Sequence, residues 1–137
     1  MALTTTIART WEYPLQATTF SMKYAEDIMK PAYGPIIAKM GANRHIPLEY
    51  RYAPREMNGL GLPYIYTLQG ISHIKTLVGN MGTGNKLAKL LKAQLDTSSI
   101  KLGTETNIFD LDFKTGNTLL TKCWIKLVWE FTCKYNI

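Results

Sequence analysis

The chain has 137 residues, of which 46% are hydrophobic and 19% are charged, so its composition excludes a disordered segment and fits one domain with a real core. No stretch approaches about 18 consecutive apolar residues, and the N-terminal residues lack a basic region followed by an apolar run. Neither a membrane span nor a signal peptide is therefore expected.

Two helices are expected before Gly41. Apolar residues at helical spacing predict the first, which Pro14 ends; these residues are Leu3, Ile7, Ala8 and Trp11. The second follows the N-cap-type residues of 18–21 and repeats the i, i+3, i+4, i+7 pattern over four turns. Because an interior proline costs a helix about 3 kcal/mol, its two prolines predict two helical halves that meet in a bend near residues 30–31.

Residues 41–63 contain too many helix breakers for a helix, which predicts a long irregular loop. The breakers are Pro47, Pro54, Pro63, Gly59 and Gly61. Arginines and tyrosines alternate along this loop: Arg44, Arg51 and Arg55, with Tyr50 and Tyr52 between them. Such side chains can clamp phosphates and stack on bases. In the alternative, which the sequence favours equally, the tyrosines pack the loop against the core and the arginines are solvated.

Residues 64–78 are predicted to form a helix, and a glycine-rich turn follows over 79–84. Asn85 is expected to cap a short helix that ends at Leu95. Around that helix the leucines gather on one face, and the opposite face carries Lys86, Lys89 and Lys92. This lysine row is either a face that contacts phosphates or the solvated side of a core helix.

The last part of the chain is predicted to be a loop followed by an apolar helix. Residues 98–117 form the loop, with one extended piece over 107–113. Residues 118–135 form the helix, which is apolar around most of its circumference apart from a polar stripe of Lys122, Lys126, Glu130 and Lys134. Such a helix needs burial on several sides, so either it dimerises or docks a partner, or it packs on more of the same polypeptide.

The two cysteines, Cys123 and Cys133, lie ten positions apart on this helix and point to different sides of it. They predict two buried, unpaired thiols in a reducing compartment, and hence an intracellular protein of the nucleus or cytoplasm. No CxxC or Cys/His cluster is present, so a structural zinc site is not expected.

No segment of the sequence carries the pattern of an enzyme active site. In the turn 79–84, one residue separates the last glycine from Lys86 and no Ser or Thr follows, which excludes a phosphate loop. Asp110 and Asp112 share one face of the predicted extended piece, but no third carboxylate or histidine lies near them in sequence. A solvated strand face is favoured over a metal or acid–base site, so no catalytic residue, metal or cofactor is expected.

The excess of basic residues is confined to the middle of the chain. Residues 39–101 carry nine basic and three acidic side chains, whereas the segments before and after are each balanced. The formal net charge of +6 therefore belongs to this part of the sequence. A localised basic excess favours a polyanionic partner, and the alternative is a generally basic surface.

These elements together predict a mainly α fold. We expect a single small irregular helical bundle with one long loop that contains Pro and Gly, over about 41–63, and at most one short extended segment.

Three phrases of the sequence resemble a known family. They are KMGANRHIP over 39–47, YAPREMNGLGLP over 52–63 and YTLQGISHI over 66–74. They occur in this order downstream of the catalytic palm in reverse transcriptases of non-LTR, LINE-type retrotransposons, and residues 123–131 are similar to the tail of that region. The resemblance covers about residues 13–137. It departs at Asn58, where the family usually has the first glycine of a pair.

The resemblance implies a helical thumb and connector without catalytic residues, cut from a longer polyprotein whose polymerase chemistry lies upstream. Its partners would be RNA or an RNA–DNA duplex, together with the upstream polymerase core and a downstream domain of the same polyprotein, and no membrane. Binding through backbone phosphates would then fall to the basic middle, and the residues expected to make it are Arg44, Arg51, Arg55, Lys86, Lys89 and Lys92. The alternative function is a structural module that dimerises or docks a partner through its apolar C-terminal helix.

Overall fold

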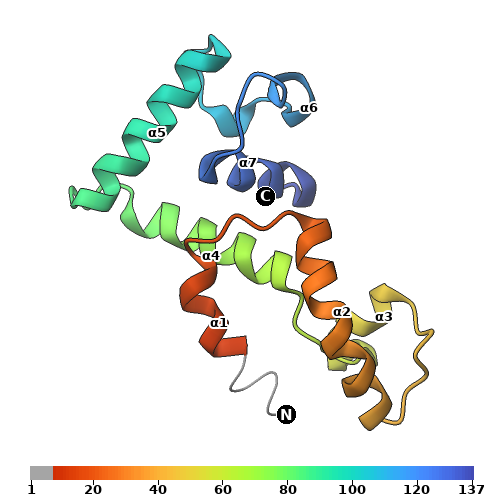
Figure 1. The fold of residues 1–137 in the computed structure, drawn as a ribbon. Coiled ribbons are helices and arrows are strands. Elements are labelled where there is room, and N and C mark those ends of the chain that lie inside the picture. The colour runs from red at the N-terminus through yellow and green to blue at the C-terminus, as the bar shows by residue number, and fades with distance from the viewer. Residues whose placement is uncertain (1–7) are drawn as a thin grey trace. The chain divides into compact units, whose positions relative to one another are not determined.

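The structure is a computed structural model that describes residues 8–137. All its regular elements are helical, so the predicted mainly α fold is confirmed, and the described residues contain no strand. The elements, in chain order, are α1 (Ala8–Leu15), α2 (Met22–Lys39), α3 (Leu48–Tyr52), η2 (Arg55–Met57), α4 (Ile65–Asn80), α5 (Lys86–Leu102), η3 (Ile108–Asp110), α6 (Phe113–Gly116) and α7 (Trp124–Tyr135) (Figure 1).

The described chain divides into two compact units. The first contains the described residues up to Leu15 together with Phe20–Gln69, and the second contains Gln16–Thr19 and Gly70–Ile137. Helix α4 supplies residues to both. The single domain expected from the chain length stays a prediction, and each unit is described by itself below.

In the first unit, α1 includes Pro14 and continues to Leu15, one residue beyond the predicted end. Of the residues that predicted this helix, Leu3 and Ile7 lie outside the described residues. Helix α2 begins after Ser21, whose hydroxyl accepts a hydrogen bond from the backbone N–H of Tyr24 at 3.3 Å, as the N-cap prediction requires.

The expected two halves of α2 are wrong, because the helix is continuous from Met22 to Lys39 with both prolines inside it. The missing N–H of each proline leaves one carbonyl of the preceding turn without its helical partner. One row of side chains at spacing four is buried and offsets that loss: Ala25, Met29, Tyr33 and Ile37. The helix ends before Gly41, which has a φ of +72°, so the predicted end is confirmed.

The segment 41–63 is less irregular than predicted, since it contains the short helices α3 and η2. Backbone hydrogen bonds fold it back on itself: the N–H of Leu60 donates to the carbonyl of Tyr50, and that of Leu62 to the carbonyl of Arg51, both at 3.0 Å. A Cβ at Gly59 would overlap the backbone of Ala53, so only glycine fits this crossing. Helix-breaking residues thus shape a compact loop here.

The second unit has its core between the C-terminal half of α4, the helices α5 and α7, and η3, with α6 beside α7 (Figure 1). The buried residues of this core are Leu77, Leu91, Ile108, Leu120, Ile125, Val128 and Trp129. Two glycines allow close packing: a Cβ at Gly70 would overlap the ring of Phe131, and one at Gly116 would lie 2.6 Å from the ring of Trp129.

Two predictions about this unit are wrong, one about where a helix ends and one about the kind of element. Helix α5 continues to Leu102, beyond the expected end at Leu95, and stops where Gly103 adopts a left-handed φ of +65°. The expected extended piece over 107–113 is instead η3 and the start of α6, capped by Asn107 and Asp112. Their side chains accept hydrogen bonds from the backbone two residues later, which favours turns over strands.

Helix α7 begins at Trp124 and not at the expected residue 118. The ammonium group of Lys126 donates hydrogen bonds of 2.7 Å to the carbonyls of Asn117 and Leu120, and so stabilises the non-helical approach to α7. Five apolar side chains of α7 are buried in the second unit, whereas Trp124 is half-buried and Tyr135 is 42% exposed; the buried five are Ile125, Leu127, Val128, Trp129 and Phe131. This helix therefore finds its burial within the chain.

Candidate nucleic-acid interface

The lysine row of Lys86, Lys89 and Lys92 occupies the first two turns of α5, and all three side chains are exposed. Asn85 fixes the start of this helix, as predicted, since its side chain accepts a hydrogen bond of 2.7 Å from the N–H of Ala88. The Asn85 amide also donates to the Asn80 side chain at 3.0 Å, which connects the start of α5 to the end of α4. A spacing of three residues places the lysines in one row on the helix.

The face opposite the lysine row is less buried than its leucines predict. Leu91 is buried and Leu95 half-buried, but Leu87 and Leu90 are 42% and 67% exposed. The expected solvated lysine face is present, but the expected buried leucine face is only partly buried. Leu91 and Leu95 line a cavity of about 410 Å³, and Lys89 and Lys92 are among the residues that line the same cavity.

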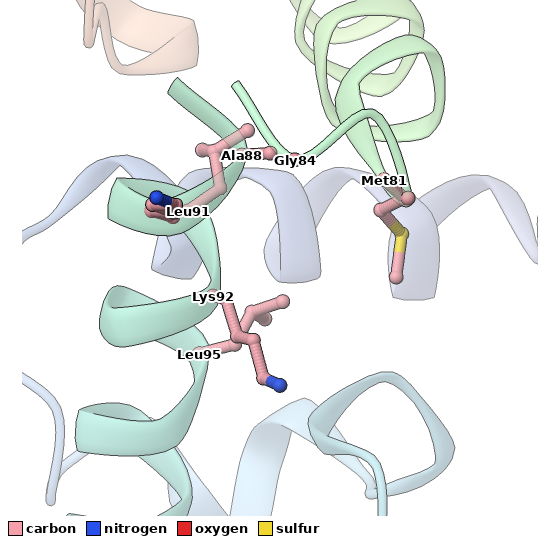
Figure 2. A pocket seen from close by; sticks show the side chains of 8 residues that line it. Met81, Gly84, Ala88, Leu91, Lys92 and Leu95 are labelled. Atoms are coloured by element: carbon pink, nitrogen blue, oxygen red, sulfur yellow. The ribbon is translucent and has the colours of Figure 1, made fainter. Parts of the chain in front are cut away.

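The far wall of this cavity comes from the turn after α4. Figure 2 shows Met81 facing Lys92 and Leu95 across the opening, with Gly84 at the end of the turn. Gly82 and Gly84 both line the cavity and have φ values of +86° and +68°, which glycine adopts without strain. The glycine-rich turn thus forms one wall of a ligand-sized space. Sequence reasoning missed this space because cavities depend on packing between segments.

The three arginines of the loop 41–63 do not share one role. Arg51 is half-buried, and its guanidinium donates to the carbonyl of Ile46 at 3.0 Å and to that of Arg44 at 2.8 Å. These hydrogen bonds fix the backbone of the loop. The guanidinium of Arg51 is therefore engaged within the protein and has fewer N–H groups left to donate to a phosphate. Arg44 is exposed, and so is Arg55, whose side chain lies beside Gly61.

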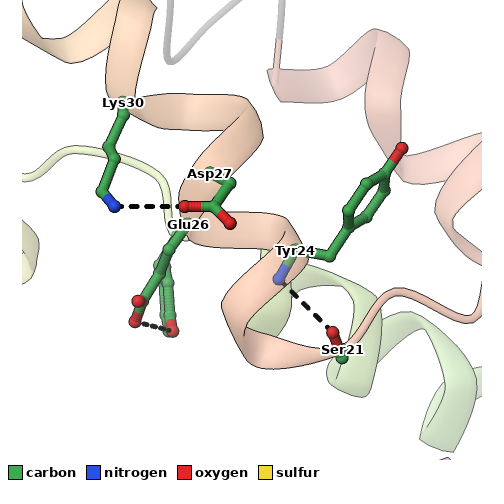
Figure 3. Close-up of polar contacts among 6 residues, drawn as sticks. Ser21, Tyr24, Glu26, Asp27 and Lys30 are labelled. Carbon is green, nitrogen blue, oxygen red and sulfur yellow. Dashed lines mark hydrogen bonds and ion pairs between the residues drawn. The ribbon is translucent and has the colours of Figure 1, made fainter.

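Arg44 and Arg51 also line a small cavity of about 180 Å³ in the first unit. Lys30 and Glu26 of α2 line it as well, and Figure 3 shows how these two are engaged. Lys30 forms an exposed ion pair with Asp27 at 3.1 Å, and the carboxylate of Glu26 accepts a hydrogen bond from the hydroxyl of Tyr64 at 3.1 Å. Much of the charge around this cavity is therefore already engaged.

Tyrosine rings pack the loop against α2 and against Tyr64, the residue just before α4. The ring of Tyr52 lies 5.8 Å from that of Tyr33 and 4.6 Å from that of Tyr64, and the hydroxyl of Tyr33 donates to the carbonyl of Pro63. Burial raises the pKa of both Tyr33 and Tyr52 above the ordinary tyrosine value. Tyr50, by contrast, is 43% exposed. Of the two open alternatives, packing describes Tyr52, while Tyr50 remains accessible for stacking.

The six predicted residues belong to two different units, each described by itself, so their grouping into one site stays a prediction. The three arginines belong to the first unit, and the three lysines belong to the second. Within the second unit the lysines share a row on α5, and two of them share a cavity. Within the first unit, Arg51 is committed to the loop while Arg44 and Arg55 are exposed.

The other side chains considered for catalysis or metal binding, Asp110, Asp112 and His73, lie in helix caps, short helices or the core. Asp112 caps α6 and Asp110 lies in η3, so the two carboxylates do not share a strand face as expected. His73 is 1% exposed, and its ring lies 4.9 Å from that of Trp124. Across residues 8–137, no group of three or more His, Cys, Asp or Glu side chains is arranged to hold a metal ion.

The two thiols differ from the expected buried pair. Both are free, but Cys123 is half-buried and Cys133 is exposed, with its sulfur 3.8 Å from the carbonyl of Leu111. Cys133 lies on the side of α7 that the core leaves open. Within the part of the chain that the structure describes, no helix combines the length and the apolar character needed to cross a membrane.

Comparisons of the chain with protein-family models, with curated proteins and with solved structures found no match.

Proposed function

We propose that this chain is a nucleic-acid-binding segment without catalytic residues that corresponds to the thumb or connector of a non-LTR retrotransposon reverse transcriptase. In this role it holds an RNA template and its primer through backbone phosphates. The observation that carries the proposal is the exposed lysine row of Lys86, Lys89 and Lys92 on α5. Three cations in one row on a rigid, capped helix can neutralise neighbouring phosphates of one strand.

The local geometry of the second and third family-like phrases supports the resemblance. Asn58, which stands in place of the family's usual glycine, has a φ of +59°, a conformation that glycine and asparagine adopt most readily. Gln69 and Gly70 of the third phrase are buried, as is His73. The left-handed turn at Asn58 and the buried positions of Gln69, Gly70 and His73 each restrict which residue fits there. Such restrictions account for recurrence of these phrases in proteins with the same local fold.

Arg44 and Arg55 are proposed as secondary phosphate contacts, because both are exposed on the loop of the first unit. Arg51 positions the backbone of that loop through its bonds to Ile46 and Arg44, and it is not a primary phosphate ligand in this proposal. The proposed partners are RNA or an RNA–DNA duplex, with an upstream polymerase core and a downstream domain of the same polyprotein, in an intracellular setting.

The alternative, a module that dimerises or docks through its C-terminal helix, was expected because that helix is apolar around most of its circumference. Most of its apolar side chains are buried within the second unit, including Trp129 and Val128 at 0% exposure. No observation therefore favours this alternative as a second function.

The proposal is tested by titrating binding of the purified chain to a blunt RNA–DNA hybrid over a range of salt concentrations. If phosphates are contacted, the logarithm of the affinity falls linearly with the logarithm of the salt concentration, with a slope of about −0.9 per phosphate. Absence of binding at low salt would overturn the proposal. A salt-independent affinity would overturn it too, because phosphate contacts release counterions.

A further inference from the structure

The cavity beside the lysine row has the size of a ligand site. Its volume is about 410 Å³, within the range of roughly 300–1,000 Å³ that is typical of small-molecule pockets. It lies wholly within the second unit, between the start of α5 and the turn after α4. Its lining residues are Met81, Gly82, Gly84, Ala88, Lys89, Leu91, Lys92 and Leu95.

The lining combines two kinds of chemistry at one place. Met81, Leu91 and Leu95 supply an apolar surface, and Lys89 and Lys92 supply cations, while no carboxylate lines the cavity. A purely apolar ligand would leave the lysines without a partner, and an inorganic anion would leave the apolar surface unused. The lining therefore suits a molecule with an apolar body joined to a negative charge.

The glycine wall adds backbone groups to this surface. No atom lies within 4 Å of a Cβ built at Gly82 or at Gly84, so their backbone is uncovered on that side. The turn is held in shape by Thr83, whose N–H and hydroxyl both donate to the carbonyl of Asn80, at 3.2 Å and 2.9 Å. An uncovered backbone of fixed shape can hydrogen-bond the polar edge of a flat ring.

We infer that this cavity takes an unstacked nucleobase from the same strand whose phosphates contact the lysine row. The inference rests on the proposed function and names the form of nucleic acid that is recognised: an unpaired nucleotide in place of a continuous duplex. From Lys86 to Lys92 the row rises about 9 Å along the helix axis, the length of a few phosphates. A strand along that row brings a base to the cavity, which Lys89 and Lys92 border.

An acidic amphipathic helix is the rival occupant, and the distribution of charge disfavours it. A second cavity of about 380 Å³ shares Met81 and Leu95 with the first, but no residue with a charged side chain lines it. A helix laid across both cavities would meet lysines at one end alone. A nucleotide needs its apolar surface and its cations at the same place, which is what the first cavity offers.

The test compares two single-stranded oligonucleotides of equal length, oligothymidylate and an abasic strand, which carry the same phosphates and differ in their bases. The wild-type chain is expected to bind oligothymidylate about three- to tenfold more tightly, as burial of a base against aliphatic side chains predicts. Met81→Ser should bring this ratio close to one and leave the salt slope unchanged. Met81 is 60% exposed, so the substitution leaves the core intact. Ile100→Ser, at a residue of α5 that is 79% exposed and does not line the cavity, should keep the wild-type ratio.

The outcomes separate this inference from the proposed function. Equal, salt-dependent binding of both oligonucleotides overturns the inference and leaves the proposed function standing. Binding of the RNA–DNA hybrid without binding of either single strand likewise overturns the inference and leaves the proposed function standing. Displacement of oligothymidylate by an acidic amphipathic peptide, without a difference between thymidylate and abasic strands, reassigns the cavity to a protein partner. No binding of any nucleic acid at low salt overturns both.

Discussion

The side chain of Gln69 in α4 is hydrogen-bonded twice to the backbone of Phe20, just before α2. Its amide nitrogen donates to the Phe20 carbonyl and its amide oxygen accepts from the Phe20 N–H, both at 3.0 Å. Gln69 is 2% exposed, so water does not replace these bonds. A glutamine thus pairs with the chain as a neighbouring strand would, and holds the entry to α2 against α4 within the first unit.

Replacing Gln69 with leucine should lower the free energy of unfolding by about 1–3 kcal/mol, because the backbone N–H and carbonyl of the half-buried Phe20 then lose their hydrogen-bond partners. Urea unfolding followed by circular dichroism measures the difference. Gln94→Leu is the matched control, since Gln94 is exposed on α5, and it should change stability by less than about 0.5 kcal/mol. Equal effects of the two substitutions would contradict the role given to Gln69.

Two glycines of α4 should respond to alanine in opposite directions. At Gly70 the added methyl group overlaps the ring of Phe131, so Gly70→Ala should destabilise the fold by about 1–3 kcal/mol. At Gly79 nothing lies within 4 Å, so Gly79→Ala should stabilise the helix by about 0.5–1 kcal/mol. Thermal unfolding of both variants tests the pair. A Gly70→Ala variant as stable as wild type would show that α4 and α7 do not pack this closely.

Asn58 should tolerate glycine but not alanine. Its φ of +59° costs a residue with a Cβ and no local hydrogen-bonding side chain about 1 kcal/mol, whereas glycine adopts it freely. Asn58→Gly, which restores the usual residue of the family, should keep or raise the midpoint of urea unfolding. Asn58→Ala should lower it. A reversed order would argue against the left-handed turn, and against the physical reason offered for this departure from the family.

The stability of the fold should fall in alkaline solution because of its buried tyrosines. Burial, and then the neighbouring Tyr52, raises the pKa of Tyr33 above the ordinary value of 10.0. The folded state then holds the phenolic proton more tightly than the unfolded state does. This stabilisation is complete below pH 10 and is lost as the pH rises above the unfolded-state pKa.

In Tyr33→Phe, the free energy of unfolding should therefore fall less steeply above pH 10 than in wild type, as urea unfolding at a series of pH values would measure. Tyr13→Phe is the control, since Tyr13 is 84% exposed, and it should keep the wild-type profile. If Tyr33→Phe followed the same profile as wild type, the alkaline loss would belong to other groups.

Periodicity and capping chemistry predicted the helices well where local residues decide them. Ser21 and Asn85 were recognisable as N-caps, and Gly41 as the residue after a helix end, because each acts through its own side chain or its own φ. The continuity of α2 through its prolines was not predictable in this way. It depends on the buried row from Ala25 to Ile37, a tertiary effect that overrides local preference.

The candidate site shows the same division. The lysine row follows from a spacing of three in the sequence, and the structure keeps it. The commitment of Arg51 to the carbonyls of Ile46 and Arg44 was hidden, because it requires the path of the folded loop. The cavity that joins Met81 to Leu95 was hidden too, since it lies between residues of different elements. The sequence predicts which side chains share a face of one helix, but it does not predict contacts or cavities between separate segments.

The most direct test of the central claim compares two triple variants that lose the same charge. One is Lys86/Lys89/Lys92→Ala, and the other removes three lysines outside the row, Lys114, Lys122 and Lys134. The measurement is the slope of log affinity for an RNA–DNA hybrid against log salt concentration. If the row contacts phosphates, its loss makes the slope shallower by about two to three, and the control variant keeps a slope close to that of wild type. Equal slopes for the two variants would mean that net charge alone governs binding, and would contradict the account.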